Sequence, residues 1–302
     1  MSKFKSGFVS IIGVPNVGKS TILNSMMGAK LAIISNKPQT TRNIIRGVVN
    51  SDTSQIIFVD TPGIHASKSK LGANMVKMSE GAITGTDVIL FVVSANKKEI
   101  TEENAKILEK LAKVKTPVFL VINKVDMVDK GDILPLTVKY SQVLQFAEIF
   151  PISATKGDNL GNLKETIIQY LPEGPRYFPE DMSTDASDEF IIAEMIREKA
   201  LYLLSDEIPH GIAVEIMKLS QRDTKNIIDV EATIYCERDS HKGIVIGKGG
   251  AMLKDIGTRS RADIQRLYDG KINLQLWVKV KENWRDSDFY IKNFGLKADK
   301  MK

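Results

Sequence analysis

The stretch Gly13-Val-Pro-Asn-Val-Gly-Lys-Ser20 constrains the fold of this chain more than any other part of it. It has the spacing G-x-x-x-x-G-K-[ST], follows the apolar run 8–13 and precedes a segment of helical character. In such a unit the backbone amides of the loop and the start of the helix face an anion. The spacing predicts a phosphate-binding loop in which Lys19 reaches the β- and γ-phosphates and Ser20 ligates Mg²⁺. The predicted nucleotide contacts are Gly13, Val14, Pro15, Asn16, Val17, Gly18, Lys19, Ser20 and Thr21.

Short β-branched runs and longer segments of helical character alternate from residue 8 to residue 171. This alternation predicts an α/β domain with a mostly parallel sheet, helices on both faces, and a ligand site at the carboxyl ends of the strands. We expect strands at 8–13, 54–60, 87–94, 117–123 and 148–153, and helices at 21–28, 71–83, 101–113, 134–146 and 159–171.

Three further segments stand at the ends of expected strands. Asp60, Thr61, Pro62 and Gly63 follow the strand at 54–60, where a carboxylate is placed to hold Mg²⁺ through water and the Gly63 amide to sense the γ-phosphate. After the strand at 117–123 comes Asn123-Lys124-Val-Asp126, whose carboxylate accepts from N1–H and N2–H₂ of guanine. Losing such paired contacts costs about 2–5 kcal/mol, so GTP is preferred to ATP. The third segment is Ser153, Ala154 and Thr155, where a backbone amide is expected to meet guanine O6.

A stretch rich in proline and acidic residues, 173–188, separates two parts of the chain. It cannot continue a helix and lacks strand alternation, so we expect a linker there. The predicted organisation is a nucleotide-binding domain at 1–172, the linker, and an α+β domain at 189–302. For that domain we expect a long helix from 189, strands at 213–220, 226–237 and 272–282, a helix at 251–267 and a terminal helix near 285–297.

Gly247-Lys-Gly-Gly250 forms a G-x-x-G loop ahead of the helix at 251–267. That spacing alone is a weak signal, and a glycine-rich connection in an unrelated α+β domain is the alternative. The order helix, strand, strand, helix, helix, strand resembles the type II KH fold, whose loop clamps about four single-stranded nucleotides. The resemblance implies RNA contacts from Ile246, Gly247, Lys248, Gly249, Gly250, Lys254 and Arg259. We expect Trp284, Phe289 and Tyr290 to pack on the domain rather than to stack on a base.

The distribution of charge agrees with this placement. The net charge of +5 is the sum of +7 over residues 1–172, −9 over residues 173–237 and +7 over residues 238–302. Only the last of these regions contains the G-x-x-G loop. A basic surface beside that loop predicts salt-dependent contacts with phosphates, from residues that include Arg261.

The nucleotide segments together resemble the translation-factor-related branch of P-loop GTPases over residues 7–172. The stretch Lys37-Pro-Gln-Thr-Thr-Arg42 then resembles their first switch, and we expect Thr41, or Thr40 as the alternative, to close over Mg²⁺ and the γ-phosphate. This implies a catalytic set of Lys19, Thr41 and Gly63, with Ser20, Thr41 and Asp60 at the Mg²⁺ ion.

The means of positioning the attacking water differs from that of Ras-like enzymes. Ile64 stands where those enzymes carry a water-orienting glutamine, so slow intrinsic hydrolysis is expected. Asn16 together with the QTTR stretch resembles GTPases that bind K⁺ beside the β- and γ-phosphates, where the ion neutralises charge. The alternative is that Asn16 only shapes the loop. His65 is expected to be a surface residue of the switch.

The whole arrangement, including GVPNVGKS, QTTR, DTPGIH, NKVD, SAT and GIVIGKGG, resembles the Era family of GTPases over nearly the entire chain. That resemblance implies GTP or GDP with Mg²⁺, the 3′ end of small-subunit rRNA as the RNA partner, and a role in 30S assembly under control of the nucleotide state. One alternative, a degenerate nucleotide fold, predicts the loss of key boxes. A second places a regulatory GTPase at a membrane surface through the basic residues Lys292, Lys297, Lys300 and Lys302.

Composition bounds the location of the protein. The chain is 43% hydrophobic and 26% charged, which is ordinary for a globular protein, and its single cysteine, Cys236, cannot form an internal disulfide. No run approaches the roughly 18 consecutive apolar residues of a membrane span. We expect a cytoplasmic monomer, with peripheral association at the inner face of the cell membrane as the alternative location.

Overall fold

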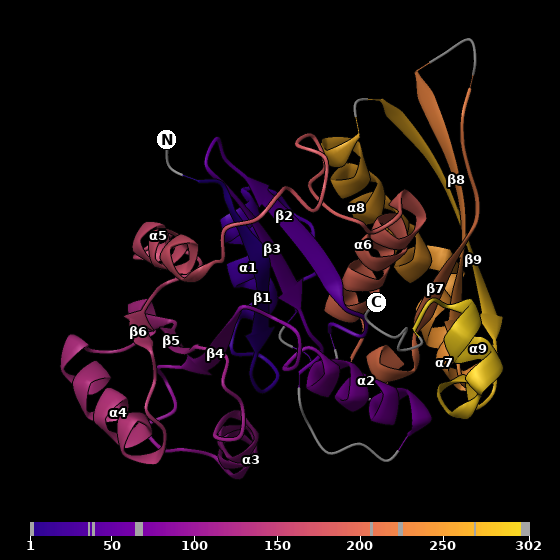
Figure 1. Ribbon diagram of the computed structural model, residues 1–302. Helices are drawn as coiled ribbons and strands as arrows, with labels where there is room; N and C mark the ends of the chain where they lie inside the picture. Colours follow the sequence, from indigo (N-terminus) through magenta and orange to yellow (C-terminus); the bar gives the residue numbers. More distant parts are fainter. Residues whose placement is uncertain are drawn as a thin grey trace.

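The computed structural model describes residues 3–35, 37, 40–63, 69–205, 208–222, 226–268 and 270–296. Figure 1 shows two units side by side, the first coloured indigo to magenta and the second orange to yellow. The first unit consists of β1 (Lys5–Ile12), α1 (Lys19–Met27), β2 (Ile45–Asn50), β3 (Ser54–Asp60), α2 (Lys70–Gly81), β4 (Val88–Ser94), α3 (Glu102–Leu111), β5 (Val118–Asn123), α4 (Lys130–Val143), β6 (Glu148–Pro151) and α5 (Leu160–Tyr170).

The sheet of the first unit has six strands in the order β2-β3-β1-β4-β5-β6. All neighbouring pairs are parallel except β2 with β3, which confirms the expected α/β class. The strand β2 was missing from our sequence expectation. Its residues IRGVVN include a glycine and are only partly buried, so the run lacks the continuous apolar character of the central strands.

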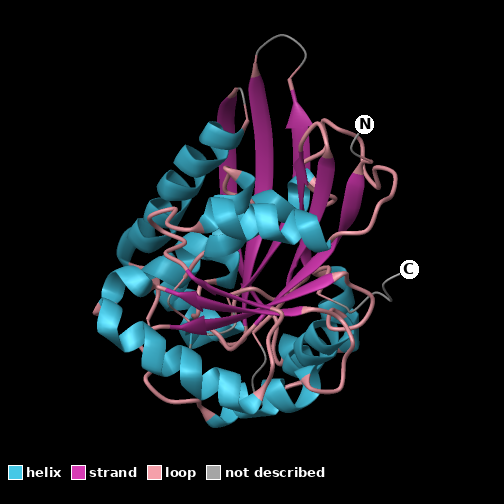
Figure 2. Ribbon diagram, turned by 60° about the vertical axis from the view of Figure 1, so that its left-hand side comes forward, coloured by secondary structure: helices cyan, strands magenta, loops and turns pink. Residues whose placement is uncertain are grey.

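Helices lie on both faces of this sheet (Figure 2), and alternate residues of each central strand explain why. In β4, Leu90 packs into the cluster that α1 and α5 cover, whereas Phe91 packs into the cluster that α3 and α4 cover. A strand buried on both faces reads as a continuous apolar run. The helix α4 begins at Lys130 rather than at 134, and Pro135 lies inside it.

The second unit follows the expected order with α6 (Asp188–Leu203), β7 (Ala213–Gln221), β8 (Ile227–Cys236), α7 (Asp239–Ile246), α8 (Ala251–Leu267) and β9 (Lys271–Val280), then α9 (Asp288–Asn293). Its sheet has the order β7-β8-β9, with β7 antiparallel and β9 parallel to β8. Trp284 is fully buried, as expected, but the packing expected for Phe289 is wrong, because that ring is 65% exposed. Phe289 lies on the outer side of a short helix of which only Ile291 is buried.

The segment 173–188 is not a free linker but lies along the first unit. Tyr177 and Phe178 donate their backbone N–H groups to Gln55 Oε1, and Val48 N–H donates to the carbonyl of Ser183 at 2.8 Å. Further along, Thr184 Oγ1 donates to the Arg46 carbonyl at 2.7 Å. These bonds cover the exposed edge of β2, which would otherwise present unpaired backbone groups.

The two units meet through α2 as well as through the linker. Leu71, Met75 and Met78 on α2 share an apolar cluster with Trp284 and Ile291 of the second unit. The first unit therefore contributes to this interface its helix α2, which is the next described element after the Asp60–Gly63 segment. Within the described ranges, no helix is both long enough and apolar enough to cross a bilayer.

Candidate nucleotide site and nucleic-acid interface

The loop between β1 and α1 has a shape that requires glycine. Gly18 has a φ of 101°, and a Cβ atom there would lie 2.3 Å from the side-chain nitrogen of Asn123. Asn123 Nδ2 donates to the Val17 carbonyl at 2.9 Å, and Lys124 Nζ donates to the Asn16 carbonyl at 2.7 Å. Residues at the end of β5 and just after it therefore bind one side of the loop. The other side stays open to a phosphate group.

Lys19 and Asp60 are buried charges beside this loop. Lys19 Nζ donates to the carbonyls of Gly13 and Val14, each at 3.0 Å. Burial lowers the pKa of Lys19 to about 8, and the Asp60 carboxylate opposes that change. Burial raises the pKa of Asp60 to about 6, while Lys19 and the hydroxyl of Ser20 oppose it. Phosphates beside the ammonium group and a cation beside the carboxylate would each favour the charged form.

The structure brings the three predicted Mg²⁺ residues together. Ser20 Oγ donates to Asp60 Oδ2 at 2.7 Å and lies 3.0 Å from Thr41 Oγ1. Thr40 instead donates its hydroxyl to the carbonyl of Lys37 at 2.6 Å, so the hydroxyl beside Ser20 is that of Thr41, while both threonines line the adjoining pocket. Asp60 Oδ1 is buried and has no hydrogen-bond partner, as expected of an oxygen suited to an ion or its bound water.

The predicted base-binding residues converge at the ends of β5 and β6. Asn123 Oδ1 accepts from the Ala154 backbone N–H at 3.0 Å, and Ser153 Oγ donates to Asp126 Oδ1 at 2.6 Å. Asp126 itself is exposed, so its second oxygen remains accessible to a base. Among the residues that line the adjoining pocket are Ile33, Ile34 and Ser35, which the sequence analysis did not single out.

Gly63 closes one side of the phosphate site. It is buried, and a Cβ atom there would lie 2.9 Å from the ring of Pro15, so the segment after β3 lies directly against the phosphate loop. Pro62 accepts a hydrogen bond from Ser79 Oγ at 2.7 Å, which ties the same segment to α2. Ile64 and His65 lie outside the described residues.

A groove beside the G-x-x-G loop runs between α8 and β9. It is lined by Gly250, Leu253, Lys254, Gly257, Thr258, Arg261, Leu274 and Leu276. Of the predicted RNA residues, Gly250 and Lys254 lie in the groove, whereas Arg259 does not. Arg259 donates to Asp255 at 2.8 Å, and its guanidinium lies 5.8 Å from the centre of the Tyr202 ring on α6. Sequence analysis missed Leu274 and Leu276, although the alternation in INLQLWV places both on one face of the strand.

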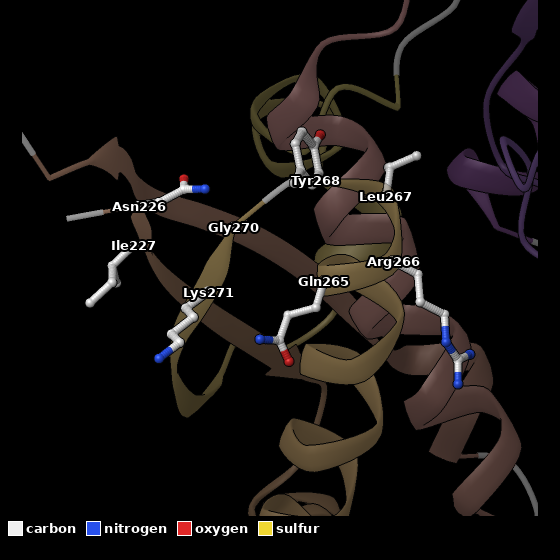
Figure 3. Close-up of a pocket in the computed structure, with 8 residues that line it drawn as sticks. All are labelled: Asn226, Ile227, Gln265, Arg266, Leu267, Tyr268, Gly270 and Lys271. Atoms are coloured by element: carbon white, nitrogen blue, oxygen red, sulfur yellow. The ribbon is translucent and has the colours of Figure 1, made fainter.

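A second hollow lies at the other end of α8 (Figure 3). Gln265 from α8 and Lys271 from the start of β9 extend into the same region as Asn226 beside the start of β8, whereas Arg266 points away from them. The helix α8 thus carries the groove at its beginning and this polar hollow at its end.

Comparison with known proteins follows this division of the chain. Residues 8–124 match a family described as 50S ribosome-binding GTPase, and residues 207–285 match the KH domain. The GTPase Era of Clostridioides difficile (strain 630) is 57% identical over 293 residues, which cover 97% of this chain and 98% of that protein. The chain belongs to the Era family of GTPases. The Era-family protein of Ruminiclostridium cellulolyticum is 51% identical over 297 residues, 98% of this chain and 99% of its own length.

Solved structures of the Era family agree with the fold over both units. A variant of Era from Aquifex aeolicus bound to GDP and AlF₄⁻ has a TM-score of 0.94 at 41% identity, with 98% of this chain and 100% of that chain covered. Era in complex with MgGDPNP and nucleotides 1506–1542 of 16S ribosomal RNA matches with the same TM-score, identity and coverage. This member of the Era family is therefore a GTPase with a carboxyl-terminal KH domain.

Proposed function

We propose that this Era-family GTPase binds the 3′ end of small-subunit rRNA through its KH domain during 30S assembly, and that its nucleotide state controls this binding. The observation that carries the proposal is a phosphate pocket, with the expected base-binding residues brought together beside it, in the same chain as a groove at the G-x-x-G loop. A relative at 41% identity, which this chain matches over 98% of its length, holds 16S rRNA together with MgGDPNP. We propose the domain limits 1–172, 173–188 and 189–302, with 173–188 as a docked connection.

We assign the residues of the phosphate loop to the nucleotide. Its amides would surround the β-phosphate, and Lys19 would exchange its bonds to the Gly13 and Val14 carbonyls for phosphate oxygens. Asp126, oriented by Ser153, would accept from guanine, and a backbone amide of the segment Ser153, Ala154 and Thr155, which Asn123 holds in place, would donate to O6. The remaining assigned contacts are Thr21, Thr61, Pro62, Gly63, Lys124 and Thr155.

The chain also fits a Mg²⁺ ion between Ser20, Thr41 and Asp60. The buried, unpartnered Asp60 Oδ1 and the two hydroxyl groups 3.0 Å apart are a hard-oxygen donor set of the kind that Mg²⁺ prefers. When bound, the ion would neutralise charge on the β- and γ-phosphates. The contribution of the protein would be to place Thr41 and Gly63 on the γ-phosphate side of the loop and to hold the ion, through bound water, at the buried carboxylate of Asp60.

We further propose that hydrolysis is slow without an activator and that K⁺ stimulates it at Asn16. The support is geometric: Asn16 is exposed and has a φ of 65°, and its backbone carbonyl accepts a hydrogen bond from Lys124. The test is hydrolysis measured in KCl and in NaCl at equal ionic strength. Faster turnover in KCl is expected, and equal rates would show that Asn16 only shapes the loop.

The RNA-binding surface we propose is the groove between α8 and β9 together with the G-x-x-G loop. Gly249 and Gly250 have positive φ angles, and no protein atom lies within 4 Å of a Cβ placed on either, so a sugar–phosphate chain can approach the backbone. Lys248, Lys254 and Arg261 would contact phosphates. Bases would lie on Leu253, Leu274 and Leu276. The RNA chain would continue toward the hollow at Gln265.

We propose that the protein acts in the cytoplasm as a monomer. The alternative at a membrane surface depends on Lys292, Lys297, Lys300 and Lys302, of which only Lys292 lies within the described residues. No observation favours that alternative over the RNA groove.

The deciding experiment is crosslinking of the GTP-bound protein in cells, followed by sequencing of the attached RNA. Enrichment of the 3′ end of small-subunit rRNA is expected, and its absence would refute the assembly role. Gly249→Asp, which places a carboxylate in the loop, should abolish crosslinking and leave GTP affinity unchanged. Gly85→Asp is the matched control, because Gly85 also has a positive φ and open surroundings but lies in the GTPase domain.

A further inference from the structure

The KH unit holds the switch backbone on both sides of Thr41. On one side, Arg197 of α6 donates from Nη2 to the carbonyl of Thr40. On the other side, the side chain of Arg42 is buried in the KH unit, where it donates to the carbonyls of Ile212 and His210 and lies 5.6 Å from the centre of the Trp284 ring. Thr41 is the residue between these two anchors.

Arg197 is held rigidly in this position. Its side chain is 2% exposed, and its Nε and Nη2 atoms both donate to Glu194 at 2.6 Å. A buried ion pair contributes little net stability, because desolvation of the two charges offsets their attraction. The two parallel hydrogen bonds to Glu194, a fork, do fix the plane of the guanidinium group. In that plane one N–H is directed at the Thr40 carbonyl.

Other residues of α6 bind the segment that leads into the switch. Glu198 accepts from the Ile34 backbone N–H at 2.9 Å and from Lys30 Nζ at 2.5 Å. The carbonyl of Leu204, just after α6, accepts from Lys37. Lys30, Ile34 and Lys37 therefore contact α6 or the residue after it, so the bond from Arg197 to Thr40 is one of several between α6 and this part of the chain.

From these contacts we infer that Arg197 is a positioning residue for GTP binding and hydrolysis, supplied by the KH unit to the GTPase site. This inference rests on the proposed nucleotide function. Arg197 holds the Thr40 carbonyl, and this keeps the adjacent Thr41 hydroxyl 3.0 Å from Ser20 Oγ at the Mg²⁺ position. The two equilibria are coupled: if docking of the KH unit strengthens GTP binding, then bound GTP strengthens docking of the KH unit by the same free energy.

The inference predicts a difference between two nucleotides, because Thr41 contacts the γ-phosphate and Mg²⁺ but not the phosphates of GDP alone. In the full-length protein, Arg197→Gln should weaken MgGDPNP binding about tenfold and leave GDP affinity unchanged. The kcat should fall by a similar factor, and amides at residues 40–42 of the GDPNP complex should exchange hydrogen faster. Arg197→Lys, which keeps one donor but not the fork, should restore part of the loss.

Two controls separate positioning from general stability. Glu194→Gln keeps the Arg197 donor to Thr40 but removes one of the two acceptor oxygens that orient it, so it should lower the GDPNP-to-GDP affinity ratio by less than Arg197→Gln does. Arg222→Ala removes another arginine of the KH unit, one that pairs with Asp229 of β8 at 2.6 Å rather than with the switch. It should leave the ratio unchanged.

The outcomes are distinguishable. If Arg197→Gln lowers both affinities equally, or neither, the positioning role is wrong. Should that variant fail to fold because Glu194 is left unpaired, the double variant Glu194→Gln with Arg197→Gln removes the buried charge and must show the same tenfold loss for GDPNP alone. If the unmodified protein binds neither nucleotide, the proposed function itself fails.

Discussion

Gly13–Ser20 and Gly247–Gly250 are both glycine-rich loops that lead into a helix, yet their surroundings differ. Around the first loop the protein itself fills the space: a Cβ on Gly18 would lie 2.3 Å from Asn123. In the second loop only the last two glycines face open space, because no neighbouring atom lies within 4 Å of a Cβ placed on Gly249 or Gly250, whereas a Cβ on Gly247 would lie 2.7 Å from Met252. The first loop is shaped by its own protein neighbours, whereas Gly249 and Gly250 leave room for a ligand.

Because of this difference, substitutions in the two loops should have different effects on stability and on ligand affinity. In the first loop, structure and ligand binding depend on the same contacts, since Asn123 supports the loop and also links it to Ala154. At Gly249 and Gly250 a side chain would meet no neighbouring protein group, although the positive φ angles oppose it, so its main effect would be to obstruct the partner. Substitutions in the first loop should therefore affect stability and affinity together, and those at Gly249 or Gly250 should affect chiefly affinity for the partner.

The largest effect is expected for Gly18→Ala. Both the positive φ and the 2.3 Å approach to Asn123 oppose a methyl group, so unfolding free energy should fall by about 1–3 kcal/mol. Affinity for GTP should fall about 100-fold, equal to about 2.7 kcal/mol. Thermal unfolding and nucleotide titration measure the two quantities. Gly28→Ala is the control, because Gly28 also has a positive φ at the end of α1 but nothing within 4 Å; normal GTP affinity in Gly18→Ala would contradict the comparison.

A narrower effect, confined to the ligand, is expected for Asp126→Asn. The side chain is exposed, and the hydroxyl of Ser153 that donates to it can donate to an amide oxygen as well, so stability should change little. Loss of the paired acceptor should weaken GTP binding by about 2–5 kcal/mol. Xanthosine triphosphate should gain affinity, because its carbonyl at C2 accepts from the new amide. Competition titrations with both nucleotides provide the readout, and an unaltered preference for guanine would remove Asp126 from the base site.

The smallest effect is expected for Lys254→Gln in the open groove. One lost phosphate contact should lower RNA affinity a few-fold and reduce the slope of log K against log salt by about 0.7. Binding of a single-stranded RNA at several salt concentrations measures the slope. Arg259→Gln is the matched control, since Arg259 pairs with Asp255 outside the groove. If Arg259→Gln reduced the slope more than Lys254→Gln, the RNA would bind the opposite face of α8 and the proposed groove would be wrong.

The parts of the fold that sequence analysis predicted are those governed by local patterns. The central strands are buried on both faces, so their apolar runs are unambiguous, and the phosphate loop has a spacing that few other structures need. The edge strand β2 escaped prediction because its burial depends on the linker that covers it. The choice of Thr41 over Thr40 likewise needed the position of Ser20, which lies 21 residues away along the chain.

Contacts between the units could not be predicted at all. Arg42 and Arg197 read as ordinary charged residues of a switch and an amphipathic helix, yet both are among the largest fully buried side chains. Arg197 is buried where α6 meets the switch, and Arg42 where the switch meets residues 209–212 and Trp284, so both depend on partners more than 150 positions away, 157 in the case of Thr40 and Arg197. Arg259 illustrates the reverse case, because its sequence position beside the loop did not reveal which side of α8 it occupies.

The bonds that fasten residues 173–185 to the first unit also set how strongly the second unit is retained near it. The last of them, between Asp185 and Arg46, leaves only Ala186 and Ser187 before α6 begins. Two extended residues reach about 7 Å, far less than the roughly 50 Å that a free segment of sixteen would span. The switch and α6 thus face each other at the high effective concentration of a very short tether, so contacts that would be too weak between separate molecules suffice to hold them together.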